Sequence, residues 1–146
     1  MSAHEIAQWI EDNYEDYKSL RKLKAWPVFA RRRYQISLAR EKGSVDNNIA
    51  KLLKASSTVE FHATCGVELV DEGYFSLAQK QIREALINYV KLEKNLLSPK
   101  YPGDFSRRFL DTCKRFIEES VSHFNLVMNR KLSSLNSGIE GKTYRV

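Results

Sequence analysis

Apolar residues recur at steps of three and four along most of the chain, a spacing that places them on one face of an α-helix. The pattern first appears over residues 2–26, where Ser2 and Glu5 form a capping box. Pro27 then ends this helix or starts the next one, because proline fits only near a helix N-terminus. The apolar positions of this first segment are Ile6, Trp9, Ile10, Tyr14, Tyr17, Leu20 and Leu23.

Residues 28–42 are predicted to form a second helix with a poorer apolar pattern. Gly43 interrupts that pattern, and Ser44 can cap a short helix that runs through Ala55. Residues 56–58 then either separate this short helix from the next one or are absorbed into a single longer helix. The sequence leaves both arrangements open.

Local signals are strongest in 57–97, which is predicted to be an antiparallel helical hairpin. Two capping boxes mark the starts of its arms, Ser57 with Glu60 and Ser76 with Gln79. Gly73 lies where the first arm can end in a left-handed residue without steric cost. The apolar stripe of the second arm is wide enough to be covered on more than one side, which predicts that this arm is a central helix.

The last helix is predicted over 105–135, after a linker at 98–103, with Asp104 as its N-cap. Residues 136–146 lack periodicity and are predicted to be a flexible C-terminal tail. No segment shows a convincing alternation of apolar and polar residues with a period of two, the pattern that predicts a β-strand. The expected fold is therefore all-α, one domain over 1–135 built as a bundle of four to five main helices.

The hairpin resembles two known helical motifs. The spacing of Gly66, Gly73, Phe75, Ala78 and Ala85 resembles a single tetratricopeptide repeat, but such arrays ordinarily need about three repeats to bury a core. The same residues look like the turn of HEPN-class bundles, which carry an arginine followed by four to six residues and a histidine. The nearest pair here has seven residues between, Arg115 and His123. We assign no family from these resemblances.

Composition adds expectations about compartment. Cys65 and Cys113 are isolated, and the polar start of the chain does not look like a secretory leader. No apolar run approaches the roughly 18 to 20 residues that a membrane-spanning helix needs. The sequence therefore predicts a soluble cytoplasmic protein without a membrane partner.

The positive charge of the protein is concentrated in one segment. The whole chain has a net charge of +6, whereas residues 18–42 alone hold nine basic residues and one acidic residue, a net charge of +8. An uneven distribution of charge along a chain indicates more about the binding partners of a protein than about its fold. The candidate nucleic-acid contacts in this segment are Arg21, Lys22, Lys24, Arg31, Arg32, Arg33, Arg40 and Lys42.

Two alternatives compete with a basic contact face. The rings of Trp26, Phe29 and Tyr34 could stack on bases or point into the core. The arginines could contact phosphates or pair inside the protein with acidic residues of the first helix, at Glu11, Asp12, Glu15 and Asp16. Arg31, Arg32 and Arg33 lie about 100° apart around a helix, so at least one of them must border the core.

Candidate catalytic groups are few. His62 and Cys65 lie one helical turn apart, but a buried thiol beside a half-buried histidine is the commoner arrangement. Glu119 and His123 have the spacing of a solvated ion pair, and the carboxylates of a bundle metal site do not accompany them. We therefore expect no enzyme activity, no cofactor and no metal site.

Two hypotheses of function follow. The first is a small helical protein that binds the nucleic-acid backbone through 18–42, without sequence readout, as a subunit of a larger complex. The second is a protein-interaction module (adaptor, chaperone or inhibitor) that presents the hairpin or the acidic start of the first helix, and an acidic protein could then be the partner of the basic segment. The long last helix also offers a face for self-association.

Overall fold

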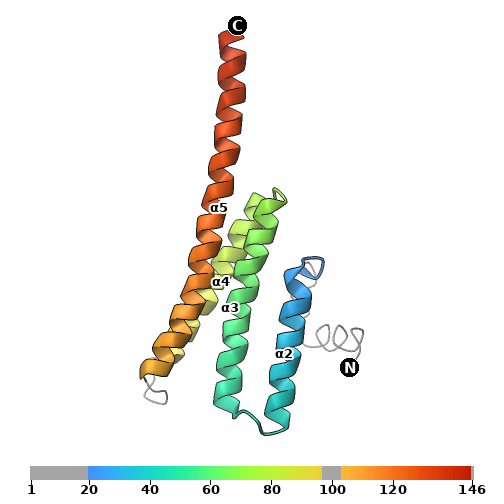
Figure 1. Ribbon diagram of the computed structural model, residues 1–146, viewed down its shortest axis with the longest axis vertical. Coiled ribbons are helices and arrows are strands. Elements are labelled where there is room, and N and C mark those ends of the chain that lie inside the picture. Colours follow the sequence, from blue (N-terminus) through green and yellow to red (C-terminus); the bar gives the residue numbers. More distant parts are fainter. Residues whose placement is uncertain (1–19, 97–102, 146) are drawn as a thin grey trace.

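The protein is described by a computed structural model over residues 20–96 and 103–145 (Figure 1). These residues form four helices: α2 (Ala25–Glu41), α3 (Asn47–Asp71), α4 (Phe75–Leu96) and α5 (Gly103–Arg145). The prediction of an all-α fold is confirmed for this part of the chain. The predicted first helix and the 98–102 linker lie outside the described residues.

Glycine turns end two of the helices. Gly73 has φ +88° and Gly43 has φ +77°, the left-handed conformation that closes a helix C-terminus. Around Gly73, the N–H of Tyr74 donates to the carbonyl of Leu69 and the N–H of Gly73 donates to that of Val70. These two bonds form a Schellman motif, which turns α3 back into α4.

The helix α3 is longer than the first arm of the predicted hairpin. It begins after Asp46, whose side chain accepts a hydrogen bond from the N–H of Ile49 at 2.8 Å, so Asp46 is the N-cap and the prediction of Ser44 is wrong. Ser57 is not a cap either, because its hydroxyl donates to the carbonyl of Lys54 within the helix at 2.7 Å. Of the two arrangements that the sequence allows, the single longer helix is the one formed.

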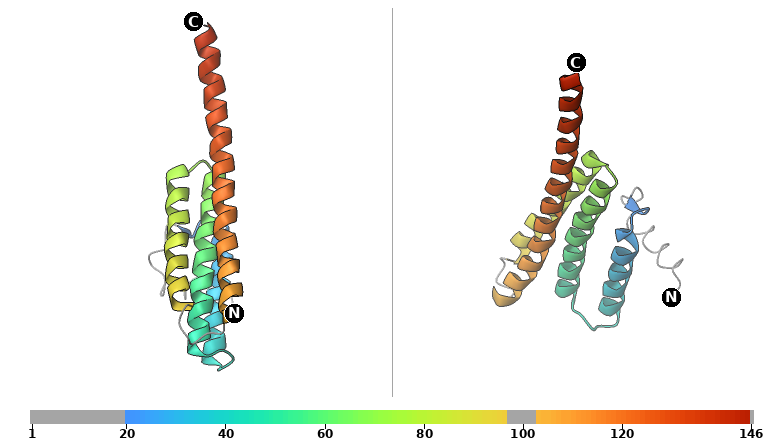
Figure 2. Two further views of the ribbon diagram at one scale, coloured as in Figure 1. Left: turned by 90° about the vertical axis from the view of Figure 1, so that its left-hand side faces the viewer. Right: turned by 45° about the horizontal axis from the view of Figure 1, so that its top comes forward.

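Among the described helices, α3 has the most neighbours, and the second arm, predicted to be a central helix, packs as α4 against both α3 and α5. α3 packs against α2, α4 and α5, whereas α2 packs chiefly on α3 (Figure 2). Small buried residues such as Ala63 and Gly66 let neighbouring helices approach it from several sides. A Cβ added at Gly66 would lie 2.6 Å from Cγ1 of Ile82 in α4 and 3.3 Å from the Ser120 hydroxyl oxygen in α5.

Two apolar clusters hold the helices together. One joins α2 to α3 around Trp26, Phe29 and Phe61 and reaches Ala78 of α4, and the two phenyl rings stack with centroids 4.3 Å apart. The other joins α3, α4 and α5 around the fully buried Val59, Leu92 and Cys113. The α2–α3 pair therefore stands at one side of an α3–α4–α5 core.

α5 continues through Arg145, beyond the predicted end at Leu135, and its second half extends past the ends of α3 and α4 (Figure 1). Leu126, Leu132 and Leu135 on this half are about half exposed. Asp104 lies inside the first turn of α5 and is not its cap. No helix in the described ranges is both long and apolar enough to cross a membrane.

Candidate functional site

The eight predicted contact residues do not form one face. Arg33 is buried, Arg21 is half-buried, and the other six are exposed. On α2, Arg31 and Arg40 are nine residues apart, so they lie about 180° from each other around the helix. The six exposed residues are Lys22, Lys24, Arg31, Arg32, Arg40 and Lys42.

Two of the three consecutive arginines interact with α3. Arg33 donates a hydrogen bond to the hydroxyl of Thr58, and its guanidinium lies over the Phe29 ring at 5.2 Å from the centroid. Arg32 forms an ion pair with Glu60, while 48% of the Arg32 side chain stays exposed. These partners differ from the acidic residues at 11–16 that the sequence suggested, which lie outside the described residues.

Three exposed cations line the solvent side of α2. Arg31 is seven residues after Lys24 and eleven before Lys42, and both end residues have helical dihedral angles. At 100° per residue the three lie within about 20° of one another, and at 1.5 Å per residue they span about 27 Å. None of them forms an ion pair with another described residue. We call Lys24, Arg31 and Lys42 the cation row.

Arg40 lies in a different cluster of positive charges, which includes Lys54 of α3. Burial lowers the pKa of Lys54, and the nearby positive charges of Arg40 and Arg33 lower it further. Lys54 is not among the contact residues predicted from the sequence. Reading 47–71 as one helix could have identified it, because Lys54 and Thr58 then share the face toward α2.

The aromatic residues of the basic segment are mostly part of the core. Trp26 and Phe29 are 7% and 3% exposed, and Trp26 packs edge-on against Phe61. Tyr34 is half-buried. Trp26 and Phe29 therefore stabilise the α2–α3 pair and are not placed to stack on bases.

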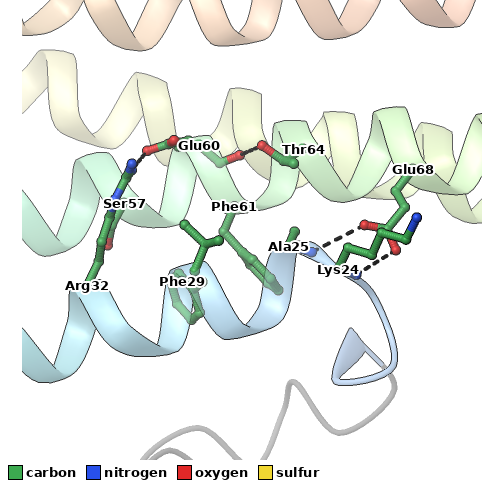
Figure 3. Close-up of a pocket in the computed structure, with 10 residues that line it drawn as sticks. Lys24, Ala25, Phe29, Arg32, Ser57, Glu60, Phe61, Thr64 and Glu68 are labelled. Carbon is green, nitrogen blue, oxygen red and sulfur yellow. Dashed lines mark hydrogen bonds and ion pairs between the residues drawn. The ribbon is translucent and has the colours of Figure 1, made fainter.

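A groove runs between α2 and α3 beside the cation row. Its first hollow, of about 210 Å³, has Ala25, Val28, Phe29 and Phe61 among its lining residues (Figure 3). A second hollow, of about 380 Å³, is lined by Ile36, Ala39, Val45 and Leu53 among others. Both hollows share Arg32, Ser57 and Glu60, so the Arg32–Glu60 ion pair lies between them. We call the two hollows together the α2–α3 groove.

One end of the groove is fixed by Glu68. Its carboxylate accepts hydrogen bonds from the backbone N–H groups of Lys24 at 2.7 Å and Ala25 at 3.2 Å (Figure 3). Lys24 is the N-cap residue of α2 and has no side-chain cap of its own. A carboxylate from α3 thus satisfies two N–H groups at the start of α2 and complements the positive end of the helix dipole.

His62 and Cys65 are not arranged as a catalytic pair. The Nδ1 of His62 lies 2.6 Å from the side-chain oxygen of Gln81, so the ring carries a proton at Nδ1 and donates it. Burial raises the pKa of the Cys65 thiol, and the charge of Glu68 raises it further. The Cys113 pKa is also raised by burial, only partly offset by the hydrogen bond with Ser56. Both thiols are thereby kept protonated and inert.

The structure pairs His123 with a residue other than the expected Glu119. Its Nε2 lies 2.6 Å from a carboxylate oxygen of Asp71 at the end of α3. Among the described residues, no group of three or more histidine, cysteine or acidic side chains could hold a metal ion.

Comparisons of the chain with protein-family models, curated proteins and solved structures find no match.

Proposed function

We propose that the protein is a non-enzymatic helical interaction module that binds a protein partner in the α2–α3 groove. The observation that carries this proposal is the pair of apolar hollows, with Val28 55% exposed beside the first of them. Grooves with apolar floors and polar rims are typical of protein-binding surfaces. In this proposal the α3–α4 hairpin is the scaffold and α2 is the contact helix.

Co-purification with two matched variants tests this function. Val28→Glu places a charge at the groove, whereas Leu77→Glu places one at a similarly exposed site on α4, where 52% of Leu77 is accessible. We expect a stoichiometric protein partner that resists nuclease and high salt, is lost with Val28→Glu and is kept with Leu77→Glu. Circular dichroism and thermal unfolding establish that both variants fold. A partner that survives Val28→Glu would contradict the groove as the binding surface.

The cation row supports a second candidate function, binding to the nucleic-acid backbone. Three cations in line over about 27 Å can contact phosphates, although the buried rings beside them offer no base stacking. Filter binding to RNA and DNA over a salt series tests this candidate. Replacing Lys24, Arg31 and Lys42 with Ala should reduce the salt dependence of binding. Replacing Arg40 and Lys51, an exposed lysine of α3, should leave it largely unchanged. Binding that does not respond to salt would exclude the candidate.

A further inference from the structure

We infer that the occupant of the α2–α3 groove is an amphipathic helix with a carboxylate-bearing edge that lies along the cation row. This inference rests on the proposed function and specifies the chemistry of its partner. The spacing of the hollows, the charges on each rim of the groove and the length of the cation row all point to such a partner.

The hollows set the spacing of the apolar anchors. Val28 lines the first hollow and Ile36 lines the second, and the two are eight residues apart on α2. Eight residues correspond to about 12 Å along a helix axis. A bound helix parallel to α2 would reach both hollows with apolar side chains at i and i+7 or i+8. The Arg32–Glu60 pair would lie under the turn between these anchors.

The two rims of the groove differ in whether their charged side chains interact with other residues of the protein. On the α3 side, Glu60 pairs with Arg32, and Glu68 accepts hydrogen bonds from two backbone N–H groups. On the α2 side, the cation row is exposed and makes no ion pair with the described residues. The acidic rim is thus already engaged while the basic rim is available. Charge complementarity therefore favours a partner with carboxylates on the edge next to α2.

The row also limits the length of the partner. Lys24 and Lys42 are eighteen residues apart, about 27 Å, so a helix of about 18 residues could contact all three cations. The phosphates of a nucleic acid could also contact the cations, but charged phosphates would not bind favourably in two apolar hollows. The combination favours a peptide helix.

Selection from a displayed library of 18-residue helical peptides, with the full-length protein immobilised, tests the inference. We expect the retained peptides to carry apolar residues at i and i+7 or i+8 and Asp or Glu along one adjacent edge. Retention of basic or uncharged peptides that compete at the groove would overturn the acidic edge while leaving the proposed function intact. If no helical peptide is retained, the inference fails, whereas the proposed function is decided by the co-purification experiment. If RNA binds at the groove where no peptide does, both the inference and the proposed function fail.

Charge reversal on α2 gives the matched control. Arg31→Glu reverses a member of the cation row, and Arg40→Glu makes the same change on the opposite side of the same helix. For a selected acidic peptide we expect Arg31→Glu to weaken binding about tenfold, and Arg40→Glu to change it less than twofold. Replacing the facing carboxylate of the peptide with lysine should restore binding to Arg31→Glu. Equal effects of the two reversals would overturn the placement of the acidic edge.

Discussion

Gly66 is the position where a single methyl group would be most disruptive. An added Cβ would lie 2.6 Å from Cγ1 of Ile82, a branched side chain that cannot rotate away freely. Alanine gains about 1 kcal/mol of helix propensity over glycine, but such overlap costs about 1–3 kcal/mol. We expect Gly66→Ala to lower the free energy of unfolding by up to about 2 kcal/mol in chemical denaturation.

The same alanine should be better tolerated once its neighbour is shortened. In an Ile82→Ala background the methyl group has space, so Gly66→Ala should cost less there than in the native protein. Gly103→Ala is the control, because a Cβ at Gly103 would meet nothing within 4 Å. An equal cost in both backgrounds would show that the close contact between α3 and α4 is not the cause.

His62 makes stability depend on pH. Burial lowers its pKa from the ordinary value of 6.5, and the charge of Arg33 lowers it further, whereas the hydrogen bond that His62 donates to Gln81 and the charge of Glu84 raise it. Because the folded pKa lies below the unfolded one, the unfolded state takes up the proton first as the pH falls. The free energy of unfolding should therefore decrease as the pH drops below about 6.5.

Replacement of the ring separates this effect from other titrations. His62→Asn cannot titrate and keeps a polar group near the Nδ1 position, so denaturation at pH 7.5 and at pH 5 should differ less in this variant than in the native protein. If the variant loses as much stability on acidification as the native chain, His62 is not the source of the dependence.

At the scale of elements, the start of α2 depends on a side chain from another helix. The carboxylate of Glu68 is the acceptor for the N–H groups of Lys24 and Ala25. Removing a helix cap costs about 0.5–2 kcal/mol, so Glu68→Ala should destabilise the protein by about that amount. Glu68→Gln keeps an acceptor but loses the charge, and should cost less.

Hydrogen exchange locates this effect. The amides of the first turn of α2 should lose more protection in Glu68→Ala than those of α4. Glu119→Ala, at an exposed position of α5, is the control and should change neither stability nor α2 protection appreciably. Unchanged exchange in the first turn of α2 would show that Glu68 does not cap this helix.

The elements also show what the sequence could predict. The Gly73 turn was predictable because a left-handed glycine after an apolar helix is a local signal. The continuity of α3 was not, because a serine hydroxyl can either cap a helix or donate to a carbonyl in the preceding turn. The burial of Ser57 at 6% exposure favours the second bond here, and burial depends on tertiary packing.

The candidate site shows the same division. The charge of 18–42 follows from composition, and the spacing of Arg31, Arg32 and Arg33 already required one of them to border the core. The sequence could not predict that Arg32 meets Glu60 and Arg33 meets Thr58, residues 28 and 25 positions away. Nor could it predict the α2–α3 groove, which exists only where two helices pack.

At the scale of the whole molecule, the four helices of residues 20–96 and 103–145 do not support one another equally. α3 contacts every other described helix, and α3, α4 and α5 share a cluster with Val59, Leu92 and Cys113. Among the described helices, α2 packs chiefly on α3, mainly through Trp26 and Phe29. The contact helix of the proposed function is thus the described helix with the fewest described neighbours, and elements of low local stability often bind partners.

We therefore expect α2 to open separately from the α3–α4–α5 core, as measured by native-state hydrogen exchange at increasing denaturant. Phe29→Ala removes about 3–5 kcal/mol of packing from the α2–α3 cluster and should lower the exchange free energy of α2 amides more than that of the slowest α4 amides. Leu92→Ala weakens the core shared by α3, α4 and α5. It should lower the exchange free energy of the slowest-exchanging amides in all three helices together. Equal shifts of α2 and α4 amides in Phe29→Ala would instead mean that the four helices unfold as one cooperative unit.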